Sequence, residues 1–406
     1  MRKVFALPYI SILLLSLICI TTVTAQNCIE VPQGSGNWVR QDGSPCDPPI
    51  ITVVPFLRIA PDARSTGMGN VGIATSGDAN SMNYNAAKYA TADKDGGISL
   101  SFVPWLKNLG LTDIYLGYLS GYYKFDKLQS VAASLRYFSL GNFTYTDINR
   151  NVIGTGNPHE FELAVAYSRK LSDKFSSALT GKYIYSNLAA GQTTTDGVDI
   201  VSAKAFAVDI GFLYKTPLKT ATKSDLSIGL AVTNIGSRIY YTKQSTGDVL
   251  PANLGLGFAY DIHFDAYNRF TLGIDINKLL VPSPNPEDVS PQDGIPDYRQ
   301  KSVISGALGS FSDAIDGGKE ELKEISLGFG AEYWYNDLFS IRGGYTYENP
   351  RKGNARYITL GLGLKYSTFG LGLSYIVPTS NLRNALDNTL RFSILFDFGT
   401  FKEDNQ

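Results

Sequence analysis

From about residue 97 onward, hydrophobic and polar residues alternate along the chain with a period of two. In residues 159–170, for example, Leu163 lies on one face and Glu162 on the other. This period is typical of β-strands whose two faces meet different surroundings. It predicts fourteen strands, at residues 97–105, 113–124, 129–138, 159–170, 175–188, 203–215, 224–233, 251–261, 269–278, 325–335, 339–348, 356–366, 371–377 and 389–398.

The segments between these strands alternate between short turns and longer polar loops. Turns such as 171–174 and 336–338 span a few residues, whereas 141–158 and 279–324 are far longer. Short turns on one side, long loops on the other and an even strand count are typical of an outer-membrane barrel. We therefore expect an all-β fold, a 14-stranded antiparallel outer-membrane β-barrel over residues 97–398, with 279–324 as its long outer loop.

A soluble sandwich or propeller also alternates, and the placement of charge separates it from a barrel. A charge that faces lipid at the bilayer midplane costs roughly 2–4 kcal/mol. Charged residues are therefore expected to be absent from the lipid-facing side of every strand that crosses a bilayer. The apolar faces of the predicted strands carry almost no charge. We place these strand charges on the opposite, lumen face: Arg136, Glu160, Glu162, Lys182, Lys204, Asp209, Asp275, Glu332, Arg342, Lys365 and Arg391. This segregation favours the barrel.

The first residues have the organisation of a secretory signal peptide. The positive start MRK precedes an apolar stretch, and the run VTA ending at Ala25 supplies small residues for a cleavage site. We expect residues 1–25 to be removed and the rest to be exported to the cell outer membrane. A retained signal anchor is the alternative.

Two cysteines, Cys28 and Cys46, remain after this cleavage. A possible disulfide between them suits an exported protein, and two unpaired thiols are the alternative. The chain has only two histidines, which leaves almost nothing for a zinc site or a His-based catalytic triad. We therefore predict no catalytic residue, no metal site and no cofactor.

Charge is scarce along the whole chain. Charged residues make up 18% and the net charge is −1, whereas soluble domains average roughly 25% charged residues. A chain without a basic field is not expected to bind nucleic acid. No apolar run of about 20 residues follows the first 25, so no transmembrane helix is expected.

Two terminal segments lack the alternation. Residues 26–96 are rich in small residues, Asn and Asp, and precede the first strand on the side that faces the inner membrane. Because the interior of a 14-stranded barrel is too wide for side chains alone to fill, we expect this extension to fold into the lumen as a hatch, or plug. Residues 399–406 follow the last strand and are expected to form a disordered tail.

The long loop 279–324 opens with Pro, Asp and Gly and continues from Val303 as a pair of short amphipathic helices. Acidic residues near its start offer hard oxygen ligands for Ca²⁺. Their order lacks the alternating acidic ladder of a calcium loop, so a solvated loop is the favoured interpretation. These residues are Glu287, Asp288, Asp293 and Asp297.

Two further motifs suggest chemistry. The run GMGNVG at residues 67–72 matches GxGxxG, but a dinucleotide fold needs βαβ units, and antiparallel alternation follows instead. Glycines that permit tight backbone packing of a plug are the favoured interpretation. The paired carboxylates Glu160 and Glu162 suggest acid–base chemistry. They lie near Arg136 on the neighbouring strand, so we interpret them as part of an ion-pair network.

The stretches PDARSTGMG (61–69) and ANSMNYNAAK (79–88) resemble the N-terminal hatch of the PorV family, also called LptO, the outer-membrane component of the type IX secretion system. The hatch residues that carry the resemblance are Pro61, Asp62, Arg64, Gly67, Met68, Gly69, Asn83 and Asn85. The resemblance continues through residues 116–141, 166–188, 311–335 and 374–398, and so covers essentially the whole exported chain. The looser hatch pattern is shared with FadL-type fatty-acid transporters. Here NAA stands where that pattern usually has Asn-Pro-Ala, so a proline-fixed backbone is lost.

The resemblance implies a role in protein export. PorV-like proteins associate with the type IX translocon barrel and bind the C-terminal signal domain of secreted cargo. They carry the cargo to a surface attachment complex with a sortase-like peptidase. The alternative is a FadL-like outer-membrane channel for hydrophobic small molecules or lipids. A third alternative is an outer-membrane enzyme, but the chain lacks a plausible nucleophile–base pair for catalysis.

The hatch also has an expected electrostatic anchor. We predict that Arg64 pairs with a lumen carboxylate, Glu160, Glu162 or Glu332, and that outer-membrane lipid surrounds the barrel.

Overall fold

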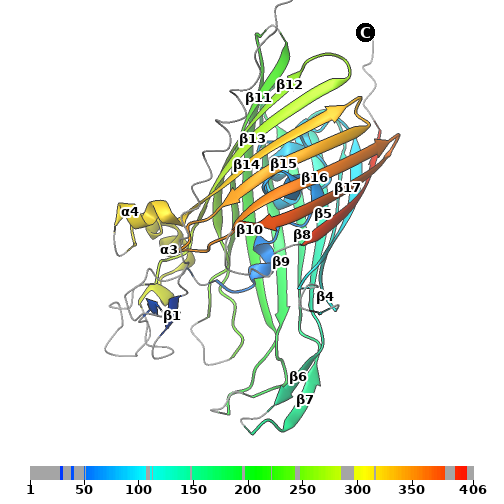
Figure 1. Cartoon of the computed structure of the whole chain (residues 1–406). Coiled ribbons are helices and arrows are strands. Elements are labelled where there is room, and N and C mark those ends of the chain that lie inside the picture. The colour runs from blue at the N-terminus through cyan, green and yellow to red at the C-terminus, as the bar shows by residue number, and fades with distance from the viewer. Residues whose placement is uncertain are drawn as a thin grey trace, which may run out of the picture.

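The computed structural model of this chain describes residues 28–30, 38–40, 50, 52–106, 110–111, 113–146, 149–193, 197–220, 222–242, 247–284, 297–314, 317–379 and 389–399. Within them, fourteen strands pair antiparallel in chain order, and the last pairs with the first to close a barrel (Figure 1). The predicted 14-stranded antiparallel barrel is confirmed, and the strand ends differ from the prediction by three residues or fewer. The barrel strands are β3 (Gly96–Pro104), β4 (Ile114–Lys124), β5 (Gln129–Leu140), β8 (His159–Lys170), β9 (Phe175–Asn187), β10 (Ala203–Leu218), β11 (Lys223–Gly236), β12 (Asn253–His263), β13 (Asn268–Leu279), β14 (Ile325–Tyr335), β15 (Phe339–Tyr347), β16 (Arg356–Tyr366), β17 (Phe369–Pro378) and β18 (Leu390–Phe398).

Short elements lie outside this ring. The hatch holds η1 (Pro55–Arg58), α2 (Ala63–Gly67), η2 (Ser81–Asn83) and η3 (Ala86–Thr91); the loops hold β1 (Cys28–Glu30), β2 (Trp38–Arg40), β6 (Phe143–Thr146), β7 (Val152–Gly156), η5 (Asp297–Arg299), α3 (Val303–Gly309), α4 (Gly318–Glu321) and η6 (Leu322–Glu324). The helices α3 and α4 occupy the part of the long loop where a short helix pair is predicted. No helix in the described parts of the chain is long and apolar enough to cross a membrane.

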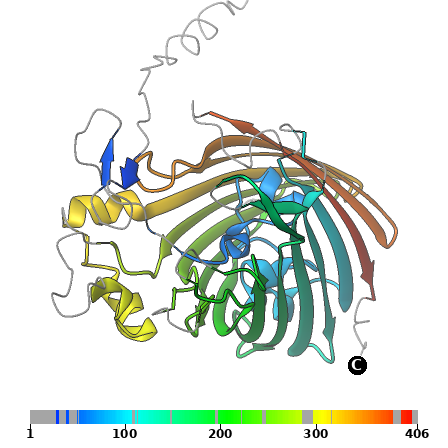
Figure 2. The same ribbon diagram turned by 90° about the horizontal axis from the view of Figure 1, so that it is seen from below.

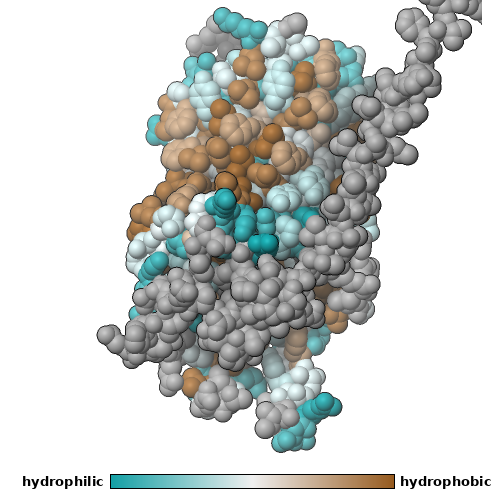
Figure 3. All heavy atoms as spheres, turned by 60° about the vertical axis from the view of Figure 1, so that its left-hand side comes forward, coloured by the Kyte–Doolittle hydropathy of each residue, from teal (hydrophilic) through white to brown (hydrophobic). Residues whose placement is uncertain are grey.

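The strands alternate between an apolar outer face and a buried inner face. In β8, Leu163 and Val165 are exposed whereas Glu160 and Glu162 are buried in the lumen. Figure 3 shows the outer face as a band of apolar side chains with hydrophilic residues above and below it.

Lys204 is an exception to the predicted placement of charge. In β10, Ala203, Ala205 and Ala207 point into the lumen, so Lys204 shares the exposed face of Phe206. Its prediction as a lumen charge is wrong. Lys204 is the second residue of the strand, close to the loop end, where a lipid-facing charge costs only about 0–1 kcal/mol.

The two ends of the barrel differ. Six connections of a few residues, such as the one between β14 and β15, lie at the end where β3 begins and β18 ends. The long connections, including the β6–β7 hairpin and the α3–α4 segment, lie at the opposite end, the lower one in Figure 1. We call these the short-turn end and the long-loop end.

The hatch, residues 52–95, runs through the lumen from one end to the other (Figure 2). At the long-loop end, the backbone amide of Val53 donates to the carbonyl of Val249 over 3.3 Å. At the short-turn end, the amide of Lys124 donates to the carbonyl of Asp95 over 2.7 Å. The chain thus enters the barrel from the long-loop end, although we expected the extension on the inner-membrane-facing side.

Two apolar clusters join the hatch to the wall. Near the long-loop end, Phe56 of the hatch packs with Leu116 and Phe138. Deeper in the lumen, Tyr89 stacks on Tyr122, with ring centroids 4.9 Å apart, among wall alanines.

Some predictions fall outside the described residues. These are the signal peptide (1–25), Cys46 of the possible disulfide with Cys28, the loop acids Glu287, Asp288 and Asp293, and the tail beyond Gly399.

Candidate functional site

The inner wall of the barrel is lined with glycines where the hatch lies against it. A methyl group added at Gly328 would lie 2.7 Å from the carbonyl oxygen of Gly69, and one at Gly229 would lie 2.6 Å from that of Ile73. Such separations are shorter than real carbon contacts, so no side chain fits there. Other wall glycines in the same position against the hatch are Gly211, Gly255, Gly257, Gly273, Gly330, Gly344, Gly361 and Gly372.

The GxGxxG run of the hatch forms the other side of this interface. An added methyl at Gly67 would lie 3.0 Å from the Cα of Gly361, and Gly69 has a positive φ of 69° besides its close approach to Phe329. Met68 between them is fully buried. The interpretation as packing glycines therefore describes the observed contacts.

Arg64 forms the electrostatic anchor of the hatch. Its Nη2 lies 2.8 Å from Oε1 of Glu332 on the barrel wall, and its Nη1 lies 2.9 Å from Oδ2 of Asp78 in the hatch. Glu332 is fully buried and also accepts from Nε of Arg342 over 2.6 Å. Of the three expected partners of Arg64, Glu332 is the one in contact; Glu160 and Glu162 lie elsewhere.

The remaining hatch residues organise the turns around Arg64. Asp62, which follows the buried Pro61, caps α2 by accepting the amide of Ser65 over 2.8 Å and also accepts the hydroxyl of Tyr84 over 2.8 Å. Asn85 caps η3, and its Nδ2 donates to the carbonyl of Phe212 over 2.9 Å. These side chains satisfy backbone groups that a short buried segment would otherwise leave unpaired.

Two buried charges lie where the hatch folds back on itself. The carboxylate of Asp275 accepts the amides of Gly72 and Ile73 over 2.7 and 3.0 Å. Nζ of Lys88 donates to the carbonyl of Gly72 over 2.6 Å. Burial lowers the pKa of Lys88 to about 8, because desolvation penalises the charged ammonium.

The charges of the long-loop half form a second network. Lys182 lies 2.7 Å from Asp209 and 3.7 Å from Glu162, so the ion-pair network predicted around Glu162 is present. Its cation, however, is Lys182 and not Arg136. Arg136 instead donates to the hatch carbonyls of Phe56 and Leu57 and to the side chain of Asn83.

Glu160 is not part of that network, because it accepts the hydroxyl of Ser186 over 2.6 Å. Of the eleven strand charges that we assigned to the lumen face, nine are buried: Arg136, Glu160, Glu162, Lys182, Asp209, Asp275, Glu332, Arg342 and Arg391. Lys365 is partly exposed, with a side-chain exposure of 30%, and Lys204 faces outward. In the described residues, no group of three or more His, Cys, Asp or Glu side chains is arranged to hold a metal ion.

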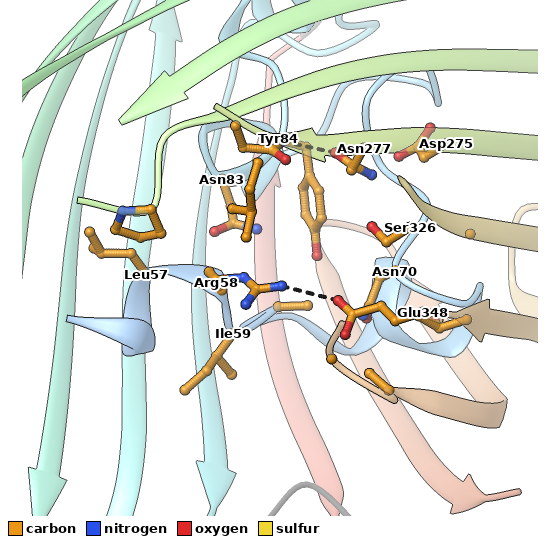
Figure 4. A pocket seen from close by; sticks show the side chains of 18 of the residues that line it. Leu57, Arg58, Ile59, Asn70, Asn83, Tyr84, Asp275, Asn277, Ser326 and Glu348 are labelled. Carbon is orange, nitrogen blue, oxygen red and sulfur yellow. Dashed lines mark hydrogen bonds and ion pairs between the residues drawn. The ribbon is translucent and has the colours of Figure 1, made fainter. Parts of the chain in front are cut away.

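Two larger cavities lie between the hatch and the wall in the described part of the chain. The outer cavity, of about 420 Å³, lies toward the long-loop end, and Figure 4 shows Arg58 reaching across it to Glu348. Polar side chains such as Asn83, Tyr84 and Asn277 face it. The inner cavity, of about 710 Å³, lies toward the short-turn end.

The long-loop end carries an exposed apolar stripe. Ile304, Leu308 and Phe311, at spacing i, i+4 and i+7, share one side of α3 and the residues after it, and Ile304 and Leu308 are 67% and 71% exposed. On the opposite side, Gly306 and Ala307 are buried against the barrel end. We call Ile304, Leu308 and Phe311 the α3 stripe.

Ion pairs fix the following part of the long loop, α4 and η6, to the barrel. Nζ of Lys278 lies 2.8 Å from Glu321 and 2.7 Å from Glu324, and Lys352 pairs with Glu320 and, over 3.2 Å, with Glu324.

The helix α3 itself is held by the packing of Ala307 against Ala252 and Leu280 and by Arg238, which donates to the carbonyl of Lys301 over 2.6 Å. The α3 stripe therefore lies on an anchored support.

Sequence reasoning missed the glycines of the wall. Their signal is glycine at every second position opposite outward leucines, as in LGLGLKY at 360–366 and FGLGLSY at 369–375. A lumen-facing residue without a side chain marks a place where another backbone approaches closely.

Comparison with known proteins shows which family and which solved structures this chain resembles. More than half of the chain, residues 46–286, matches the protein family described as type IX secretion system protein PorV. No curated protein matches the chain. Solved structures that resemble this chain include the toluene transporter TbuX of Ralstonia pickettii. Its sequence identity is 12%, the match covers 83% of this chain and 98% of that chain, and the TM-score is 0.46. A second is the toluene transporter TodX of Pseudomonas putida, with 11% identity, coverage of 82% of this chain and 98% of that chain, and a TM-score of 0.46. A third is a FadL homologue of Pseudomonas aeruginosa, with 10% identity, coverage of 86% of this chain and 100% of that chain, and a TM-score of 0.43.

Proposed function

Because this chain belongs to the PorV family, outer-membrane components of the type IX secretion system, we propose that it binds secreted cargo at the translocon. The part of the cargo that it recognises is the folded C-terminal signal domain. It then carries the cargo to the surface attachment complex with its sortase-like peptidase. In this role the protein acts by binding alone and has no catalytic residue.

The observation that carries the proposal is the α3 stripe at the long-loop end. Exposed apolar side chains on an anchored support are typical of protein-binding surfaces. The stripe lies outside the barrel strands, so lipid contact along the wall does not account for it. We assign the stripe to the cargo signal domain.

The lumen supports binding at the surface over transport through the barrel. The hatch runs through it from end to end and packs closely against wall glycines, although cavities of about 420 and 710 Å³ remain beside it. A channel for hydrophobic compounds is less well supported, because polar side chains and the Arg58–Glu348 ion pair line the outer cavity. Sites for apolar ligands are lined predominantly by apolar side chains.

The test is capture of cargo by Leu308→Glu, which places a charge in the middle of the stripe. A cargo signal domain is used as bait on detergent-solubilised full-length protein, and we expect capture to fall at least about tenfold. Ser312→Glu is the matched control, since it adds the same charge at an exposed polar position of the same segment and should leave capture unchanged.

Two outcomes would contradict the proposal. Equal capture by Leu308→Glu and wild type would remove the stripe as the docking surface. Unchanged surface display of cargo in a strain that lacks this protein would remove the shuttle role altogether.

A further inference from the structure

A tryptophan flanked by two arginines forms part of the wall of the inner cavity. Arg269 of β13 and Trp334 of β14 are direct cross-strand partners, and Arg342 of β15 lies opposite Glu332, two residues along β14. The guanidinium carbons of Arg269 and Arg342 lie 5.8 and 5.5 Å from the centroid of the indole ring. All three side chains line the cavity of about 710 Å³. We call them the Arg–Trp–Arg stack.

Each member of this stack has a buried N–H group without an acceptor in the described part of the protein. The atoms are Nε of Arg269, Nε1 of Trp334 and Nη1 of Arg342. The side chain of Arg342 is only 4% exposed and that of Arg269 is 25% exposed, and Trp334 is half-buried between them. Buried donors are paired in the great majority of proteins, so these three N–H groups on a single cavity wall are donors that a bound acceptor would satisfy.

The buried and partly buried carboxylates around the cavity bind other atoms than these three N–H groups, and Asp93, which also lines the cavity, is exposed. Glu332 accepts from Arg64 and from Nε of Arg342, and Asp397 accepts from Lys365 over 2.7 Å. Asp78 is paired with Arg64. Asp337 lies 3.8 Å from Nη2 of Arg269 and is 77% exposed, which makes a weak, solvated pair. The carboxylates of the protein therefore leave these three N–H groups of the Arg–Trp–Arg stack without an acceptor in the described residues.

We propose that the Arg–Trp–Arg stack binds an oxyanion, a phosphate or a carboxylate, that enters from the short-turn end. Guanidinium groups match both oxyanions geometrically, and hydrogen bonds between charged partners are about twice as strong as neutral ones. Turn residues Asn336 and Ser367 also line the cavity, which places its mouth at the short-turn end. The cavity is larger than one ion, so the oxyanion is either free or the headgroup of a lipid. This site lies at the opposite end of the barrel from the α3 stripe and does not depend on cargo binding.

Calorimetric titration of the full-length protein in detergent tests the site. The probes are inorganic phosphate, succinate and dihexanoyl phosphatidic acid, each compared with chloride at equal ionic strength. We expect saturation by at least one oxyanion with a Kd of about 1 mM or below. Arg269→Gln, which removes a charge without exposing a buried acid, and Trp334→Phe, which keeps the ring and removes the N–H, should each weaken binding about tenfold.

The matched control is the double variant Lys365→Gln with Asp397→Asn. Both residues line the same cavity and pair with each other, so replacing them together keeps the net charge, and binding should stay within about twofold of wild type. Saturation by phosphate or succinate supports a free ion, and saturation by the phosphatidic acid alone supports a lipid headgroup. No saturation by any probe below about 10 mM, or equal binding by Arg269→Gln and wild type, overturns the proposal.

Discussion

Arg64 joins three parts of the molecule through one guanidinium group. It reaches Asp78 and Ser76 within the hatch, Glu332 on the barrel wall and, through Glu332, Arg342 on the next strand. A buried carboxylate that loses one of two cations is left partly uncompensated, and removing one partner of a buried pair costs about 3–5 kcal/mol. The hatch therefore depends on this residue far more than on a surface pair.

Arg64→Ala should loosen the hatch while the barrel stays folded. We expect limited proteolysis to cut within residues 52–95 much faster than in wild type, with the heat-modifiable migration of the barrel unchanged. Arg58→Ala is the control, because Arg58 is a hatch arginine whose side chain is 42% exposed and whose pair with Glu348 is partly solvated. Equal protease resistance of Arg64→Ala and wild type would remove Arg64 as the anchor.

Lys88 should make hatch stability depend on pH. Its pKa in the folded hatch is about 8, below the usual 10.5, so the released hatch binds the proton more tightly. Stability then rises as the pH increases from about 8 toward 10.5, by up to about 3 kcal/mol. Urea titrations of hatch release at pH about 8 and about 10 measure the slope. Lys88→Met should flatten it, and the same slope in that variant would assign the effect to another group.

At the scale of elements, the hatch packs against the bare backbone of wall glycines. Short turns of the hatch lie on strands β10 to β17 at positions where the wall has glycine. At Gly328, Gly330 and Gly344 the hatch backbone itself meets the wall, and at Gly257 and Gly273 the side chains of Ile73 and Val71 occupy the space. Inserting even one methylene into a well-packed interface typically costs about 1–3 kcal/mol. This geometry explains how a hatch with so little regular structure is held in one position.

Gly344→Ala should displace the hatch, since its new methyl group would meet the backbone of Met68 and Gly69. We expect a loss of about 1–3 kcal/mol in hatch stability by urea titration. Gly343→Ala, one residue earlier in β15, is a matched control because nothing lies within 4 Å of its added methyl group. If both variants behave alike, close packing at Gly344 does not hold the hatch.

For the whole molecule, closure of the ring is the decisive event. β18 pairs with both β17 and β3, so without it two strand edges lose their partners. Unpaired backbone groups each cost several kcal/mol in lipid, which is why open sheets do not span membranes.

A chain truncated before Leu390 should therefore fail to form the heat-modifiable barrel band on unboiled gels. A chain truncated after Gly399 keeps every described strand pair and should form it. A folded, membrane-inserted product from the shorter chain would contradict closure through β18.

The strands and their lipid face could be predicted because the cause is local. Each strand crosses the same bilayer, so alternation appears within ten residues and needs no knowledge of a partner. The hatch motif likewise placed Arg64 among three possible carboxylates. Lys204 was misplaced because it was assigned by its charge: the alternation itself runs unbroken from Lys204 to Phe206 and Val208 and puts all three on the exposed face.

The partners of the buried charges were decided by the tertiary structure. Arg136 and Lys182 both lie near Glu162 in the sheet, and only the position of the hatch carbonyls at Phe56 and Leu57 determines which cation pairs with the acid. The same holds for the entry of the hatch from the long-loop end and for the glycines that receive it. Alternation along a strand is imposed by the solvent on either side of it. The hatch contacts instead join residues far apart in the chain, such as Arg136 and Leu57, 79 positions apart, or Thr346 and Gly69, 277 positions apart, and only the closed barrel brings them together.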